Sequence, residues 1–245
     1  MIDTQHLQSL APTGTLRGGV VVAPAKSMSF ATKADDGVVQ GVPVDLLHGF
    51  AALVNVPLSL AEFPNSGQLT DAVAEGRIDI GFMPRDAARE ARVAFGPSFY
   101  LMGSTYLVPA GSGIVTIDEV NRDGIRIVAI ANTTTARSAR RTAPLASVEE
   151  VASVDLMTAM AQRGEGDAFA LSHDSFIGLL PQIPGARVLP GQFQQTGIGV
   201  AVPPGRPGAL ALARALIEEA KANGLVRRAF DAAGFADAAV APLEA

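Results

Sequence analysis

The sequence predicts an α/β protein of two lobes, each with a mainly parallel sheet flanked by helices. Two observations lead to this prediction. Apolar runs of strand length alternate with segments of helical periodicity, and such alternation favours parallel pairing through right-handed crossovers. In addition, AVAEGRIDIGF and AMAQRGEGDAFA repeat one pattern of helix, glycine, two residues, aspartate and strand, with Gly76 and Asp79 in the first copy and Gly164 and Asp167 in the second.

The first elements follow from local pattern. LRGGVVVA, at residues 16–23, is rich in the β-branched residues that favour a strand. Leu46, Leu47 and Phe50 recur at helical spacing, which predicts an amphipathic helix over residues 45–55. A proline ends this helix, and the alternation continues with a strand at 58–63, a helix at 68–75 and a strand at 78–83.

The chain then leaves the first lobe and returns to it. Residues 97–112 and 196–203 are extended and rich in small residues, which indicates two crossings. Between them the pattern predicts strands at 125–131, 167–171 and 186–189 and helices at 136–141, 156–162 and 174–180. Helices at 207–222 and 225–233 and a loose tail complete the chain. We therefore assign residues 1–105 and 203–245 to lobe 1 and residues 106–202 to lobe 2.

Composition excludes several classes of protein. The 245 residues are 48% hydrophobic and 18% charged with a net charge of −5, which is typical of a globular chain and lacks the basic stripe of nucleic-acid-binding proteins. With no cysteine and only His6, His48 and His173, neither a disulfide nor a histidine-rich metal site is expected, and no cofactor is implied. No signal peptide or membrane span is visible, so the chain is cytoplasmic or the mature form of an exported protein.

Several segments, in order, resemble the family 3 extracellular solute-binding proteins, the polar-amino-acid receptors of bacterial ABC importers. They are GVPVDLLHGFAALVNVPLSL, LTDAVAEGRIDIGFMPRDAAREARVAFGPSFY, GIRIVAIANTTTARSA, GDAFALSHD and GIGVAVPPGRPGALALARALIEEAKANGLVRRAFDAAG, within residues 14–235. The resemblance implies the type II periplasmic-binding-protein fold, in which two crossing strands join the lobes and the ligand lies in the cleft. It also implies a monomeric, periplasmic receptor with a membrane permease as partner.

The resemblance places the ligand's carboxylate at Arg89. This position carries the family's carboxylate-binding arginine, and a guanidinium can donate two parallel hydrogen bonds while it stays charged. Asp86 occupies a position that often carries Thr or Ser, from which it could orient Arg89 or contact a ligand amine. On the second lobe, Thr133 and Thr134 match a Gly-Thr-Thr loop at a helix start, and Asn132, which tolerates left-handed backbone, replaces the glycine. The alternative for Arg89 is a solvated helix arginine, and the alternative for Thr133 or Thr134 is a simple cap of the next helix.

The ammonium and side-chain parts of the pocket differ from the family pattern. Ser172 occupies the position of the aspartate that pairs with an α-ammonium, and only the nearby Asp174 or Asp86 could supply that charge. His173 is a further candidate for contact, since an imidazole donates hydrogen bonds and titrates near neutrality. The remaining candidates are Ser27 and Ser66 at two usually aromatic positions, Phe30, Phe63 and Phe82 as substitute rings, and Gln194, Gln195 and Thr196 before the second crossing.

Together these features predict a receptor that captures a small carboxylate, either an amino acid or an organic acid, by hinge closure. Two alternatives remain open at the level of sequence. One is a cyclohexadienyl dehydratase-like enzyme, in which Asp174 beside His173 would transfer a proton. The other is a cytoplasmic ligand-sensing domain, although no helix-turn-helix precedes residue 14.

Overall fold

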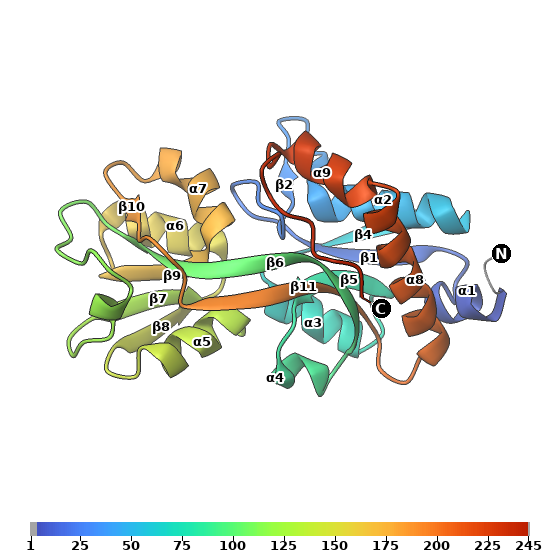
Figure 1. Cartoon of the computed structure of the whole chain (residues 1–245), viewed down its shortest axis with the longest axis horizontal. Coiled ribbons are helices and arrows are strands. Elements are labelled where there is room, and N and C mark those ends of the chain that lie inside the picture. Colours follow the sequence, from blue (N-terminus) through green and yellow to red (C-terminus); the bar gives the residue numbers. More distant parts are fainter. Residues whose placement is uncertain (1–3, 245) are drawn as a thin grey trace.

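Two long antiparallel strands connect the two halves of the molecule. In a computed structural model that describes residues 4–244, β6 (Ala94–Val108) and β11 (Gln194–Val202) run through both halves of one sheet (Figure 1). The sheet has the order β4-β1-β5-β11-β6-β9-β7-β8. We call the half around β1 the first lobe and the half around β7 the second lobe. Both predicted crossings are therefore strands of the same sheet.

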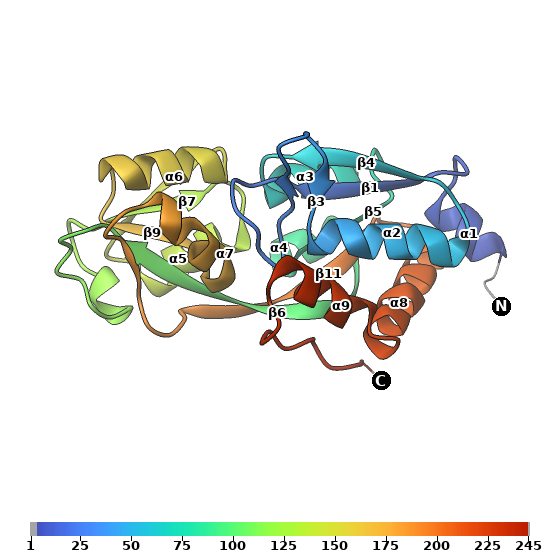
Figure 2. The same ribbon diagram turned by 90° about the horizontal axis from the view of Figure 1, so that it is seen from above.

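The first lobe is a parallel sheet covered by helices on both faces. Its strands are β1 (Leu16–Val21), β4 (Leu58–Phe63) and β5 (Ile80–Pro84), and β1 pairs in parallel with the other two. Its remaining elements are α1 (Thr4–Leu10), β2 (Thr32–Lys33), β3 (Val39–Gln40), α2 (Val42–Val54), α3 (Ser66–Ala74), α4 (Ala87–Glu90), α8 (Pro207–Ala222) and α9 (Leu225–Ala233). Both described ends of the chain lie at this lobe (Figure 2).

Apolar periodicity explains how these helices pack. The buried residues of α2, α8 and α9 form one core with β1 and β5, whereas Leu69 and Val73 of α3 pack on the opposite face. The Gly18-Gly19 pair lets both helices approach β1 closely, because a Cβ on Gly19 would lie 2.4 Å from Leu69 and a Cβ on Gly18 would lie 2.8 Å from Leu47. The glycine-containing strand thus positions α2 and α3 on its two faces.

The second lobe repeats this design. Its parallel strands are β7 (Arg126–Ile130), β8 (Ser147–Val151) and β9 (Ala168–Ser172), with α5 (Thr134–Thr142) on one face and α6 (Val154–Arg163) and α7 (His173–Leu179) on the other. The 3-10 turns η1 (Asp118–Val120) and η2 (Leu180–Gln182) and the short β10 (Arg187–Val188) complete it. β8 was not predicted, because SVEEV is a partly exposed edge strand with no apolar run.

Two further differences from the sequence interpretation concern the chain ends and the crossings. The C-terminal segment is not a loose tail, since Ala241 donates to the Phe99 carbonyl at 2.9 Å and Lys221 donates to the Pro242 carbonyl at 2.8 Å. β11 pairs with β5 from Ile198 to Ala201, so its last residues lie in the first lobe. No helix of the described chain has both the length and the apolar character needed to cross a bilayer.

Candidate ligand-binding site

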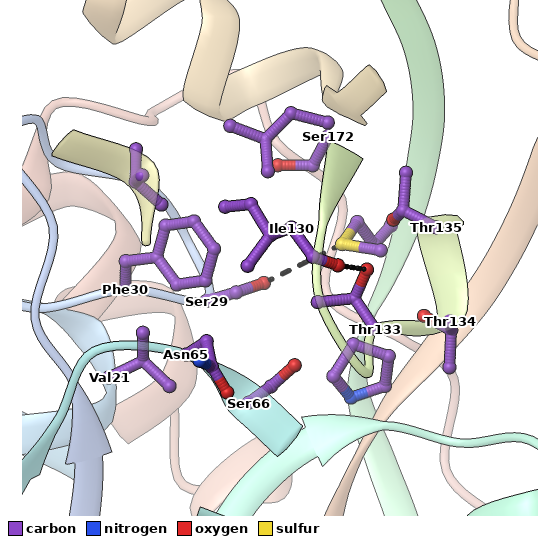
Figure 3. A pocket seen from close by; sticks show the side chains of 14 residues that line it. Val21, Ser29, Phe30, Asn65, Ser66, Ile130, Thr133, Thr134, Thr135 and Ser172 are labelled. Carbon is purple, nitrogen blue, oxygen red and sulfur yellow. Dashed lines mark hydrogen bonds between the residues drawn. The ribbon is translucent and has the colours of Figure 1, made fainter. Parts of the chain in front are cut away.

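A small cavity lies between the lobes at the carboxyl ends of four strands. Val21, Pro84, Ile130 and Leu171, at or beside the ends of β1, β5, β7 and β9, contribute to its wall (Figure 3). This is the edge of an open parallel sheet at which ligands bind. The cavity encloses about 30 Å³, which is room for roughly two water molecules. A larger ligand therefore requires the lobes to move apart.

Four helices begin at this cavity, α3 from the first lobe and α5, α6 and α7 from the second lobe. α3 is capped by Asn65, whose side chain accepts from Gln68 N, and α5 is capped by Thr133, whose hydroxyl accepts from Ala136 N at 3.1 Å. Asn132 precedes the second cap with φ of 59°, a left-handed backbone that asparagine tolerates. The Oγ1 atom of Thr134 is buried with no hydrogen-bond partner among the described residues. The cavity thus receives the positive ends of helices from both lobes and an unpaired hydroxyl.

Arg89 lies behind the cavity wall, at the boundary between the lobes. Its side chain is buried, and its guanidinium donates to Pro84 O at 2.8 Å, to Ser66 Oγ at 2.7 Å and, across the lobes, to Asn132 O at 3.2 Å. Burial, with repulsion from Arg137, lowers the pKa of Arg89 to about 9, so the group stays cationic at neutral pH. Arg89 contacts the cavity through Ser66, which stands on its wall.

Asp86 forms an ion pair between the lobes. Its Oδ1 accepts from Arg89 N at 3.0 Å and caps α4, while its Oδ2 accepts from Arg137 Nε at 2.8 Å and also from Arg137 Nη2. Arg137 belongs to α5 of the second lobe. Asp86 therefore orients the Arg89 backbone, and its carboxylate is engaged with protein groups on both sides.

Three further contacts hold the lobes together. Asn65 Nδ2 donates to Ala152 O at 2.8 Å, and Met28 N donates to Asp174 Oδ2 at 2.8 Å. Gly67 lies so near Asn132 that a Cβ on the glycine would come within 2.6 Å of the asparagine Cβ. Since each contact joins groups from different lobes, separation of the lobes would break all of them.

The run Ser172-His173-Asp174 separates in the structure. Ser172 lines the cavity and caps α7, with its hydroxyl 2.6 Å from Ser175 Oγ. Asp174 is buried beside it, is not on the wall, and accepts from Met28 N; burial raises the pKa of its carboxyl group. His173 is exposed. The proposed dehydratase pair of Asp174 and His173 therefore does not face this cavity.

The other candidate residues divide in the same way. Phe30, Ser66, Thr133 and Thr134 line the cavity (Figure 3). Six do not line it. Ser27 accepts from Ser29 N and Phe30 N within its turn, Phe82 packs edge-on against Phe50 and Phe99 in the core, and Phe63 packs against the core on the other face of the sheet. Gln195 is exposed on a separate cavity beside the C-terminal segment, and Thr196 donates to Arg85 O at 3.1 Å and accepts from Gln194 Nε2 at 3.3 Å.

Four polar or flexible wall residues were missing from the sequence candidates, namely Ser29, Asn65, Met102 and Thr135. Asn65 and Thr135 could have been found from the sequence, because each is next to a predicted candidate at the start of a helix that follows a strand. Met102 comes from the crossing strand β6, where no local pattern distinguishes wall from core. In the part of the chain that the structure describes, no cluster of three His, Cys, Asp or Glu residues could hold a metal ion.

Comparison with known proteins agrees with this architecture. The chain is 26% identical over 206 residues to the glutamine-binding protein of Geobacillus stearothermophilus, and the matched region covers 79% of this chain and 78% of that protein. A variant of ArgBP from T. maritima superposes with a TM-score of 0.81 at 18% identity, covering 93% of this chain and 98% of the other.

Two further solved structures have the same fold. An ancestral amino acid-binding protein, a precursor of cyclohexadienyl dehydratase, gives a TM-score of 0.78 at 20% identity over 92% of this chain and 98% of the other. The substrate binding protein of an amino acid ABC transporter gives 0.77 at 21% identity over 89% and 98%. These matches identify the type II periplasmic-binding-protein fold. Residues 20–232 match the family model of the bacterial extracellular solute-binding proteins, family 3, and the chain belongs to that family.

Proposed function

We propose that this protein is the solute-binding receptor of an ABC importer and that it captures a small carboxylate-bearing ligand between its lobes. The observation that carries the proposal is the convergence of α3 and α5 on one cavity, with Arg89 behind Ser66. Helix N-termini and a guanidinium both favour an anion. The relatives include the binding protein of an amino acid transporter, which supports the same role.

The two crossing strands supply the hinge. We place the bend in the stretch of β6 and β11 between their pairing with β5 and with β9, near Leu101 and Gly197. A ligand drives closure only through contacts that exist in the closed form and not in the open form. Ser66 with Arg89 on the first lobe and Thr134 on the second lobe would provide such contacts to one carboxylate.

In this role the closed, loaded form docks on a membrane permease, and the protein works as a monomer in the periplasm. The family's extracellular character supports that location. The predicted division into residues 1–105 with 203–245 and residues 106–202 is retained as a proposal, with the second boundary shifted toward Gly197 by the pairing of β11 with β5.

The experiment is a thermal-shift screen of the full chain against amino acids, monocarboxylates and dicarboxylates. A ligand at 100 times its dissociation constant should add about 2.7 kcal/mol of stability. Arg89→Ala should abolish most of the shift, measured against the ligand-free variant. Arg85→Ala is the matched control, because Arg85 is half-exposed, lies just before α4 and pairs with Glu90 of that helix, which also carries Arg89. A full shift retained in Arg89→Ala would contradict the proposal.

A further inference from the structure

Unlike a second cavity between the lobes, which Arg89, Arg92 and Arg137 line, the cavity at the strand ends has a wall with no ionisable side chain. Its 14 residues are apolar, hydroxyl-bearing or amide-bearing, and none of them is Asp, Glu, His, Lys or Arg. The amide of Asn65 is already engaged, since its Oδ1 accepts from Gln68 N and its Nδ2 donates to Ala152 O. A ligand inside therefore meets hydroxyl groups, backbone and apolar side chains.

The charges directed at this wall are positive. α3 and α5, each of nine residues, point their N-termini at the cavity from opposite lobes. Arg89 donates to one lone pair of Ser66 Oγ, and the proton of that hydroxyl is available to an acceptor in the cavity. The buried Thr134 hydroxyl has no partner in the described chain and is a second available donor. Both features stabilise an anion.

The nearby carboxylates are directed elsewhere. Asp86 is engaged by Arg89 N and by the Arg137 guanidinium. The Oδ2 atom of Asp174 accepts a hydrogen bond from Met28 N of the other lobe, and Asp174 does not reach the cavity wall. Its Oδ1 atom has no hydrogen-bond partner among the described residues. An ammonium group that entered the cavity would lose its hydration and gain no facing carboxylate, which is an unfavourable exchange for a buried cation.

We propose that the ligand is a small organic acid without an ammonium group, in contrast to the amino acids that the relatives are named for. This inference rests on the proposed capture of a carboxylate at the same site. The hydroxyls and helix ends would receive the carboxylate, and Phe30, Met102 and Leu171 would contact a short apolar or oxo-substituted chain.

The test compares acids with the amino acids of the same skeleton by titration calorimetry on the full chain. The pairs are pyruvate with L-alanine, 4-methyl-2-oxopentanoate with L-leucine and 2-oxoglutarate with L-glutamate. We expect at least one acid to bind 10-fold or more tightly than its amino partner. Tighter binding of the amino acids, lost 10-fold or more in Asp174→Asn, would overturn this inference and leave the receptor proposal intact. Binding by no acid and no amino acid would overturn both.

A gain of function provides a second test. Ser172 lies on the wall, so Ser172→Asp places a carboxylate where an ammonium could meet it, while Ser172→Asn adds the same bulk without charge. We expect Ser172→Asp to lower the affinity for the acids 10-fold or more and to raise that for the amino partners, and Ser172→Asn to change both alike. Equal effects of the two variants, with native melting curves, would contradict an electrostatic exclusion of the ammonium group.

Discussion

The ion pair between Asp86 and Arg137 should control how often the lobes are closed. The pair joins α4 of the first lobe to α5 of the second, and it can form only while the lobes are in contact. Arg137→Gln removes the charge and keeps most of the side-chain length. The expected result is a shift of the ligand-free protein toward an open form.

The geometry sets the size of the effect. The pair includes a hydrogen bond of 2.8 Å, and the side chains are 35% and 21% exposed. A hydrogen bond to a charged group contributes about 1.5–3 kcal/mol when shielded, and an exposed ion pair contributes about 0.2–1 kcal/mol. Partial exposure reduces the value for this pair to about 1 kcal/mol, which changes the ratio of closed to open molecules about 5-fold. Ligand affinity should fall in proportion to the fraction of closed molecules, by at most about 5-fold.

The assay uses the absence of native cysteine. Leu53 on α2 and Leu156 on α6 are 41% and 49% exposed and lie on different lobes, so cysteines placed there carry spin labels for a distance measurement. Arg140→Gln is the matched control, because Arg140 pairs with Glu150 at 2.6 Å inside the second lobe. An unchanged distance distribution in Arg137→Gln, or an equal change in the control, would refute the reasoning.

Three other variants test separate parts of the structure. Burial raises the pKa of the Asp174 carboxyl group, so the folded protein holds this proton more strongly than the unfolded chain, and stability falls as pH rises through the raised pKa. Asp174→Asn should flatten that fall and raise Tm at pH 7, as measured by thermal melts between pH 4 and 8. An unchanged dependence of Tm on pH would contradict this prediction. Asp79 is fully buried and accepts from Arg17 Nε at 2.8 Å, so Asp79→Asn should cost about 2–4 kcal/mol in urea unfolding, and a loss below about 0.5 kcal/mol would be inconsistent with a buried pair. Gly67→Ala should keep the lobes apart, because the new methyl group would collide with Asn132. Small-angle scattering should then show a larger radius of gyration. A radius equal to that of the unmodified protein would contradict this prediction and show that Asn132 moves to make room for the methyl group.

Local sequence determined most of the elements and several of their ends. Alternating strands and helices predicted the parallel sheets, and the left-handed backbone of Asn132 before α5 is one that asparagine tolerates. The reason is that hydrophobic period, helix caps and backbone preferences act over a few residues and are legible in a short window. The same rules missed β8, whose two glutamates face solvent at an edge.

Tertiary structure decided which candidates share the cavity. Asp86 meets Arg137 from 51 positions away, and Asp174 meets Met28 from 146 positions away, so both carboxylates are engaged with residues that no local pattern connects to them. Phe82 is in the core because its side of β5 faces α2, and Ser27 is used within its own turn. The sequence by itself established the two-lobed α/β order and the residues at the strand ends; the packing of the lobes against each other decided which charges reach the ligand, because that depends on contacts between distant segments.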